Sequence, residues 1–172
     1  MQLETLLNDM AELEIENSFR ISRNEKELQK EKLLTLFNKD HQSFDNIIYH
    51  YEKKSLVAFF RYTLTNAKIR ICSIQLKNKK EIYLRNLMTQ TLIKFDTLSF
   101  NKVESEVYKK NSESLILHLK LRFQYKSNMG RKIKLLCPKN TFLISVKSYL
   151  DSTTPNIGIA NSVAGHWSNQ QR

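Results

Sequence analysis

Residues 107–123 read VYKKNSESLILHLKLRF, and this stretch decides the fold that we predict. The segment before it, residues 103–107, alternates between small or apolar side chains and glutamates, as in a strand with one buried face. Asn111 or Ser112 then offers a short polar side chain that can cap the first turn of a helix. Apolar residues follow at helical spacing: Leu115, Leu119 and Phe123. The sequence therefore predicts a strand, a polar turn and a short helix whose N-terminus suits an anionic or amide-bearing ligand.

The composition is that of a globular protein with a strong excess of positive charge. The chain has 172 residues, 41% of them hydrophobic, and its 28 Lys and Arg against 17 Asp and Glu give a net charge of +11. This excess indicates an anionic partner, such as cofactor phosphates, an acidic carrier protein, nucleic acid or an acidic membrane surface. A basic surface that only keeps the protein in solution is the plainer alternative.

Cysteine usage and hydropathy point to the cytoplasm. Cys72 and Cys137 are the only cysteines, so the sequence has neither a disulfide framework nor a metal-binding spacing, and we expect no metal. The N-terminus is acidic and does not resemble a secretory signal. No apolar stretch is long enough to cross a bilayer.

The remaining periodicities predict helices and strands in mixed order. In residues 68–76, alternation places Ile69, Ile71 and Ser73 on one face of a strand and Cys72, Ile74 and Leu76 on the other. We expect further helices at residues 1–16, 24–37 and 81–95. We expect strands at residues 18–22, 46–51, 55–63, 68–76, 103–107, 124–127 and 132–137. Residues 141–150 fit either a helix or a strand. Residues 1–150 are predicted to form one domain with an N-terminal helix, and 151–172 a flexible tail.

The motif at 111–123 resembles the last conserved motif of the GNAT acyltransferases. The residues that fit it are Asn111, Ser114, Leu115, Leu117, Lys120, Leu121 and Phe123. His118 stands where that family usually has Tyr, and Arg122 where it usually has Gly. The resemblance implies an α+β fold (α/β, three layers) with a mixed, mainly antiparallel sheet of about six to seven strands flanked by helices.

Residues 74–88 occupy the place of the family's pyrophosphate loop. Lys79 aligns with the usual Arg or Gln, Lys80 with a glycine, and Ile82 and Leu84 with two small residues. Glycine lets backbone N–H groups approach phosphate closely, and the loop has none. Three alternatives are open for this site: looser binding through lysines, a displaced ligand, or a lost activity. Alternatively, the lysines of this loop are solvated and bind no cofactor.

The resemblance also implies a thioester site between the strands at 68–76 and 103–107, which would part after Ile74 and Val107. It implies contacts of the donor with the following residues: Ile74, Gln75 and Leu76 along the pantetheine arm, Lys79, Lys80, Ile82, Tyr83 and Leu84 at the phosphates, and Asn111 and Ser114 near the arm. His118 is the candidate acid for the leaving thiolate, or else a partly buried polar residue of the helix. We single out no general base among Glu52, Glu104 and Glu106.

The resemblance implies an acyltransferase that moves an acyl group from a thioester to an amine by direct attack. The thioester would be acetyl-CoA, another acyl-CoA or an acylated acyl carrier protein. The first alternative is a degenerate protein of the same fold that binds a ligand or partner without catalysis. A basic nucleic-acid-binding module is the second, and the scattered lysines disfavour it. The sequence does not define the acceptor, the length of the acyl group or the oligomeric state. A homodimer is one possible oligomeric state.

Overall fold

The computed structural model describes residues 2–18, 23–40 and 44–152. In chain order its elements are α1 (Leu3–Glu16), α2 (Arg23–Asp40), the short 3₁₀ helix η1 (Phe44–Asn46), β1 (Ile47–Glu52), β2 (Ser55–Thr65), β3 (Lys68–Leu76), η2 (Lys77–Lys79), α3 (Glu81–Thr97), β4 (Lys102–Tyr108), α4 (Ser112–Lys120), β5 (Gln124–Met129), β6 (Lys132–Pro138) and α5 (Lys139–Asp151). The predicted strand at 18–22 lies almost wholly outside the described residues, as does the predicted tail beyond residue 152.

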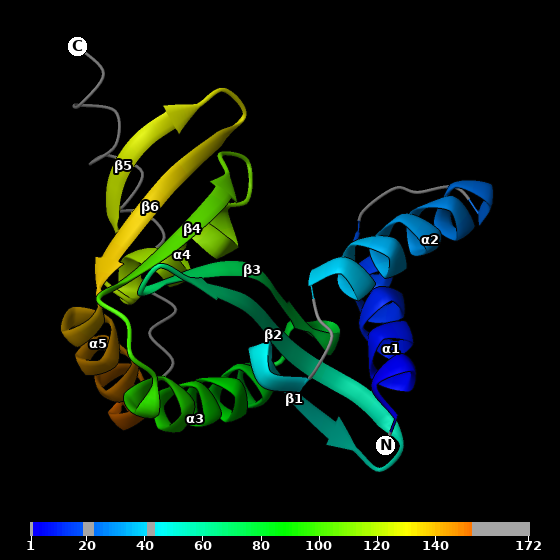
Figure 1. The fold of residues 1–172 in the computed structure, drawn as a ribbon, viewed down its shortest axis with the longest axis horizontal. Helices are drawn as coiled ribbons and strands as arrows, with labels where there is room; N and C mark the ends of the chain where they lie inside the picture. The colour runs from blue at the N-terminus through cyan, green and yellow to red at the C-terminus, as the bar shows by residue number, and fades with distance from the viewer. Residues whose placement is uncertain (1, 19–22, 41–43, 153–172) are drawn as a thin grey trace.

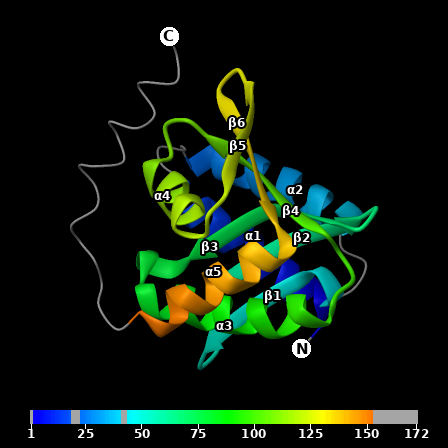
Figure 2. The same cartoon turned by 90° about the vertical axis from the view of Figure 1, so that its left-hand side faces the viewer.

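The strands form one six-stranded sheet in the order β1-β2-β3-β4-β6-β5. Every neighbouring pair is antiparallel except β3 and β4, which run parallel. Helices α1 and α2 lie on one side of the β1–β3 half of the sheet, and α3 and α5 lie on the other side (Figures 1 and 2). The predicted mixed, mainly antiparallel sheet flanked by helices is thus confirmed.

Strand β2 shows why the sequence folds in layers. Residues 56–62 are buried throughout, because helices cover both faces of the strand. Phe59 packs into the cluster beneath α1 and α2, whereas Phe60 packs into the cluster beneath α3. A run that is apolar except for Arg61 therefore marks a strand in the interior of the sheet, as predicted.

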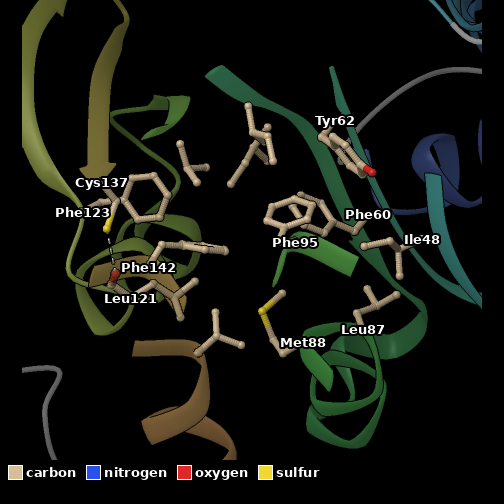
Figure 3. Packing of buried hydrophobic residues seen from close by; sticks show 14 of the residues in the cluster. Ile48, Phe60, Tyr62, Leu87, Met88, Phe95, Leu121, Phe123, Cys137 and Phe142 are labelled. Atoms are coloured by element: carbon tan, nitrogen blue, oxygen red, sulfur yellow. Dashed lines mark hydrogen bonds between the residues drawn. The ribbon is translucent and has the colours of Figure 1, made fainter. Parts of the chain in front are cut away.

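An aromatic cluster joins α3 and α5 to the sheet. Phe95 of α3 is fully buried, and its ring centroid lies 5.7 Å from Phe60, 4.9 Å from Tyr62 and 5.8 Å from Phe142 of α5. Figure 3 shows these rings between the β1–β3 side of the sheet and the α5–β6 side. The residues 141–150 that the sequence left undecided form most of α5, because Phe142 and Val146 bury one helical face in this cluster.

Strand β3 contains a bulge that the sequence did not predict. Arg61 of β2 pairs with Ser73 and the next residue, Tyr62, pairs with Ile71, so Cys72 is an extra residue without a partner in this register. The predicted alternation is therefore wrong beyond Ile71. The core face of β3 carries Ile69, Ile71, Ile74 and Leu76, whereas Ser73 and Gln75 turn toward α1.

Across the described ranges, no helix combines the length and the apolar character needed to cross a lipid bilayer.

Candidate functional site

Strands β3 and β4 part in the middle of the sheet. They pair only from Lys68 to Ile71 on β3 and from Lys102 to Ser105 on β4. Beyond this point β4 continues along β6 as far as Tyr108, while residues 73–76 of β3 stay paired with β2 (Figure 1). The strands thus separate three residues earlier on β3 than the predicted Ile74, and two earlier on β4 than Val107. Among the described residues, the separation leaves one backbone edge of β3 without a strand partner over residues 72–76.

Two helices begin beside this opening. The loop after β3 leads into α3 at Glu81, and the turn after β4 leads into α4 at Ser112. The side-chain oxygen of Asn111 accepts a hydrogen bond from the Ser114 N–H at 3.0 Å, so Asn111 is the N-cap of α4. Lys80, at the N-cap of α3, makes no such side-chain bond. The first turn of α3 therefore directs N–H groups and the positive end of a helix dipole outward.

The loop before α3 makes its sharp turn without glycine. Asn78 and Lys79 have φ angles of 52° and 50°, in the left-handed region that glycine usually fills. Asparagine enters this region more readily than most residues, which makes the turn feasible here. Ile82, Tyr83 and Leu84 then lie in the first turn of α3, and the Tyr83 hydroxyl donates to Glu52 at 2.8 Å.

An ion pair spans the gap between the two helix starts. The Lys79 ammonium nitrogen lies 2.8 Å from a carboxylate oxygen of Glu113 in the first turn of α4. Both side chains are more than half exposed. An anion that binds Lys79 from solution must therefore compete with the Glu113 carboxylate.

His118 lies behind the opening, in the interior. It is 4% exposed, its Nδ1 lies 2.6 Å from the Ser114 carbonyl oxygen, and its Nε2 lies 2.8 Å from the Ser105 hydroxyl. Burial lowers the pKa of the imidazole, and the Ser114 carbonyl counteracts only part of this effect. A neutral ring that donates from Nδ1 and accepts from Ser105 satisfies both contacts. His118 thereby connects α4 to Ser105, the last residue of β4 that pairs with β3. The role of His118 as a catalytic acid stays a prediction.

We expect His118→Phe to lower the free energy of unfolding by about 1–3 kcal/mol at pH 7.5, because it leaves the buried Ser105 hydroxyl without its partner. The pKa of His118 is lower in the folded state than in the unfolded state. Protonation therefore favours unfolding, and wild-type stability should fall as the pH drops below about 6.5.

Urea unfolding between pH 5 and 8 measures both effects. The His118→Phe curve should lose the part of this pH dependence that His118 contributes. An unchanged pH profile in the variant would contradict the buried, neutral state of the ring.

Glu14 of α1 contacts the part of β3 that does not pair with β4, a contact that the sequence did not reveal. The Ser73 hydroxyl donates to Glu14 at 3.3 Å and accepts from Gln75 at 3.1 Å. Asn17, just after α1, donates to Gln75 at 2.9 Å and to the Leu76 carbonyl at 3.2 Å. A chain of hydrogen bonds thus fixes the end of α1 along the open segment of β3.

The three carboxylates among which the sequence singled out no base are all engaged by other side chains. Glu52 accepts from Tyr83, and Glu106 pairs with Arg70 at 3.1 Å. Glu104 lies 3.0 Å and 3.3 Å from two lysine nitrogens, those of Lys68 and Lys134. Desolvation acts to raise the pKa of Glu104, but the lysines outweigh it and the pKa is lowered. Among the described residues, no group of three or more His, Cys, Asp or Glu side chains is placed to hold a metal ion.

Comparison with solved structures identifies the fold. The PaiA N-acetyltransferase of Thermoplasma acidophilum, in complex with coenzyme A, superposes with a TM-score of 0.60 at 18% identity, over 78% of this chain and 94% of that one. The chain has the GNAT fold. FdhC, a nucleotide-linked sugar GNAT, gives 0.61 at 20% identity over 87% and 90%. A point mutant of the spermidine N-acetyltransferase SpeG of Vibrio cholerae gives 0.60 at 16% identity over 83% and 95%.

Sequence comparison adds nothing to this result, since no protein-family model and no curated protein matches the chain. At these identities the structural similarity establishes the GNAT fold alone. The residues predicted as donor contacts lie on elements next to the point where β3 and β4 part, and their role stays a prediction. They are Ile74, Gln75 and Leu76 on the open part of β3, Lys79 and Lys80 before α3, Ile82, Tyr83 and Leu84 in its first turn, and Asn111 and Ser114 at the start of α4.

Proposed function

We propose that this protein is an acyltransferase that moves an acyl group from a coenzyme A thioester to an amine. The observation that carries the proposal is the parting of β3 and β4 after Ile71 and Ser105, with the starts of α3 and α4 on either side of the gap. The proteins that share the fold support it, because PaiA is an N-acetyltransferase in complex with coenzyme A and SpeG is a spermidine N-acetyltransferase.

The donor's extended arm suits the open edge of β3. An arm that carries amide groups can pair with backbone N–H and C=O groups there, as an added strand does. Ile74 and Gln75 lie on the part of β3 that does not pair with β4, whereas the Leu76 carbonyl already accepts a hydrogen bond from Asn17. Asn111 and Ser114 lie at the start of α4. The phosphates would sit at the first turn of α3, with Lys79 and Lys80 beside them. The loop glycines are absent, so we expect the first turn of α3 to supply most of the phosphate binding and the exposed lysines a smaller part.

The chemistry needs no covalent intermediate on the protein. The amine nitrogen attacks the thioester carbonyl, a backbone N–H of the open part of β3 stabilises the oxyanion, and the C–S bond breaks. The released thiolate takes up a proton. His118 is the proton donor that the motif suggests, although its lowered pKa means that the ring is neutral at pH 7.

Isothermal titration with coenzyme A tests the donor site. We expect Lys79→Ala to weaken binding by about two- to fivefold, because an exposed charge pair contributes about 0.5–1 kcal/mol. Glu113→Gln should strengthen binding by a similar factor, since it removes the carboxylate that competes for Lys79.

Lys147→Ala, which removes an exposed charge from α5, serves as the control and should leave the affinity unchanged. Absence of coenzyme A binding to the wild type would contradict the proposed function. Binding without turnover of any amine would instead favour a non-catalytic ligand-binding protein.

A further inference from the structure

A serine and a histidine lie in hydrogen-bond contact where β3 and β4 part. The Oγ of Ser105 lies 2.8 Å from Nε2 of His118, and Nδ1 of His118 lies 2.6 Å from the Ser114 carbonyl oxygen. A carbonyl oxygen can only accept, so in the neutral ring Nδ1 carries the proton and Nε2 is the acceptor. The Ser105 hydroxyl therefore donates to the imidazole, as a serine nucleophile does toward its histidine base.

The ring of His118 is held in the form that accepts a proton. The Ser114 carbonyl takes the place that a carboxylate has in a Ser-His-Asp triad, because it fixes the tautomer and the orientation of the ring. Phe123 packs against the imidazole with the ring centroids 4.8 Å apart. Burial lowers the pKa of His118, so the ring is a base at pH 7. His118 can protonate a leaving thiolate only after it has gained a proton, and the Ser105 hydroxyl is in place to supply one.

Ser105 also lies at the right distance along the strands. It pairs with Ile71 in the last step of the β3–β4 ladder, and residues 72–76 of β3 continue without β4 toward the loop before α3. At about 3.3 Å per residue this segment is about 16 Å long, which is comparable to an extended pantetheine arm. A donor whose phosphates bind at the first turn of α3 would thus bring its thioester to Ser105.

The surroundings of Ser105 restrict the acyl group. Its side chain is 3% exposed, and the buried Val103 and Val107 lie on the same face of β4. Strand β6 pairs with the other edge of β4 along its whole length, so a substrate must approach along the edge that faces β3. We therefore expect a small acyl group, with acetyl as the first to be tested.

We propose, on the basis of the function proposed above, that Ser105 and His118 hydrolyse a bound short-chain acyl thioester through an acyl-serine ester when no amine is present. This thioesterase activity is a second reaction of the same donor, separate from direct transfer of the acyl group to an amine.

The proposed reaction has two balanced halves. Ser105 gives its proton to Nε2 of His118, and the oxygen lone pair forms the bond to the acyl carbon. The C–S bond breaks with its electron pair on sulfur, and the imidazolium protonates the thiolate. Water then gives a proton to His118 and attacks the ester, and the C–Oγ bond breaks with its pair on Oγ, which takes that proton. The products are the free thiol and acetic acid, which ionises to acetate and a proton.

The test uses the full chain in amine-free buffer, with acetyl-CoA and p-nitrophenyl acetate as separate acyl donors. The second donor has neither phosphates nor a pantetheine arm, so it reports on Ser105 independently of coenzyme A binding. We expect mass spectrometry to find one acetyl group on Ser105 of the wild type, and p-nitrophenyl acetate to give a burst of about one nitrophenolate per chain. Ser105→Ala should abolish the adduct and the burst and lower the release of thiol from acetyl-CoA by about 100-fold or more.

Ser145→Ala is the matched control. Ser145 on α5 is also 3% exposed, and its hydroxyl donates to the Thr141 carbonyl at 2.7 Å. The burst and the rate of thiol release should stay within about threefold of the wild type in this variant. Ser105→Cys separates a chemical role from a structural one, because it keeps a nucleophile at the same place and should still carry an acetyl group at position 105.

An unmodified Ser105 in the wild type after exposure to both donors would overturn the proposal. So would thiol release that is unchanged in Ser105→Ala, or an acetyl group that appears on another residue and not on Ser105. If acetyl-CoA does not bind while p-nitrophenyl acetate still acetylates Ser105, the proposed function fails and Ser105 stands as a nucleophile. If acetyl-CoA binds and transfers its acetyl group to an amine but never to Ser105, the proposed function stands and the thioesterase is excluded.

Discussion

Phe95→Ala should lower the free energy of unfolding by about 3–5 kcal/mol, the largest loss of stability that we expect from a single truncation in this chain. Phe95 is fully buried and contacts four aromatic rings, those of Phe60, Tyr62, Phe100 and Phe142. Removal of its ring leaves a cavity that four rigid neighbours can fill only in part. The loss should therefore lie toward the upper end of this range.

The position of Phe95 explains why the effect should extend to the whole fold. Phe60 and Tyr62 belong to β2, Phe100 to the connection between α3 and β4, and Phe142 to α5. Beyond the point where β3 and β4 part, the two halves of the sheet lose their hydrogen bonds to each other, and side-chain packing must hold them together. The aromatic cluster supplies this packing (Figure 3).

Urea unfolding of Phe95→Ala and of Ile93→Ala gives the measurement and its control. Ile93 lies on the same helix but is 66% exposed, so its truncation should change the free energy of unfolding by less than about 0.5 kcal/mol. A loss below about 1.5 kcal/mol in Phe95→Ala would mean that the neighbouring rings close the cavity. The cluster would then not be the element that joins the two halves.

The order of the elements could be predicted because local patterns encode it. The apolar run of β2, the cap at Asn111 and the helical spacing from Leu115 to Phe123 are each set by neighbours in the chain. The bulge at Cys72 could not be predicted in this way. An extra residue in one strand shows only in its register with another strand, and an alternating pattern continues through it without a break.

The same limit applies to the candidate site. The position of the loop between β3 and α3 followed from the sequence, because it depends on a strand and a helix that are adjacent in the chain. Glu14 and Ser73, or Lys79 and Glu113, meet only in the folded protein, since 59 and 34 residues separate them. Asn78 does carry a signal for the turn before α3, because asparagine tolerates positive φ more readily than most residues.

Ile82→Asp should weaken coenzyme A binding by about 30-fold while leaving the fold intact. Ile82 is the second residue of α3 and is 55% exposed, so the substitution empties no cavity. An acidic residue in the first turn of a helix favours the helix by about 0.3–1 kcal/mol, because it complements the positive end of the dipole. We therefore expect a melting temperature equal to or slightly above that of the wild type.

The same carboxylate opposes a bound phosphate. Two like charges about 6 Å apart repel each other by about 2–3 kcal/mol at an effective dielectric constant near 20, and salt reduces this to about 2 kcal/mol. Titration of Ile82→Asp with coenzyme A measures the effect. Ile93→Asp places the same charge near the other end of α3 and should bind coenzyme A as the wild type does.

The contrast with Lys79 makes this prediction a sharp test of where the phosphates bind. Lys79 is exposed and already paired with Glu113, so its removal changes the field at the opening only slightly. An aspartate at position 82 would instead lie among the N–H groups of the first turn of α3 and occupy the place that the phosphates need. Unchanged affinity in Ile82→Asp would therefore exclude the start of α3 as the phosphate site. A weaker affinity in Lys79→Ala would not alter this conclusion, because a long exposed lysine side chain can reach an anion that is bound elsewhere.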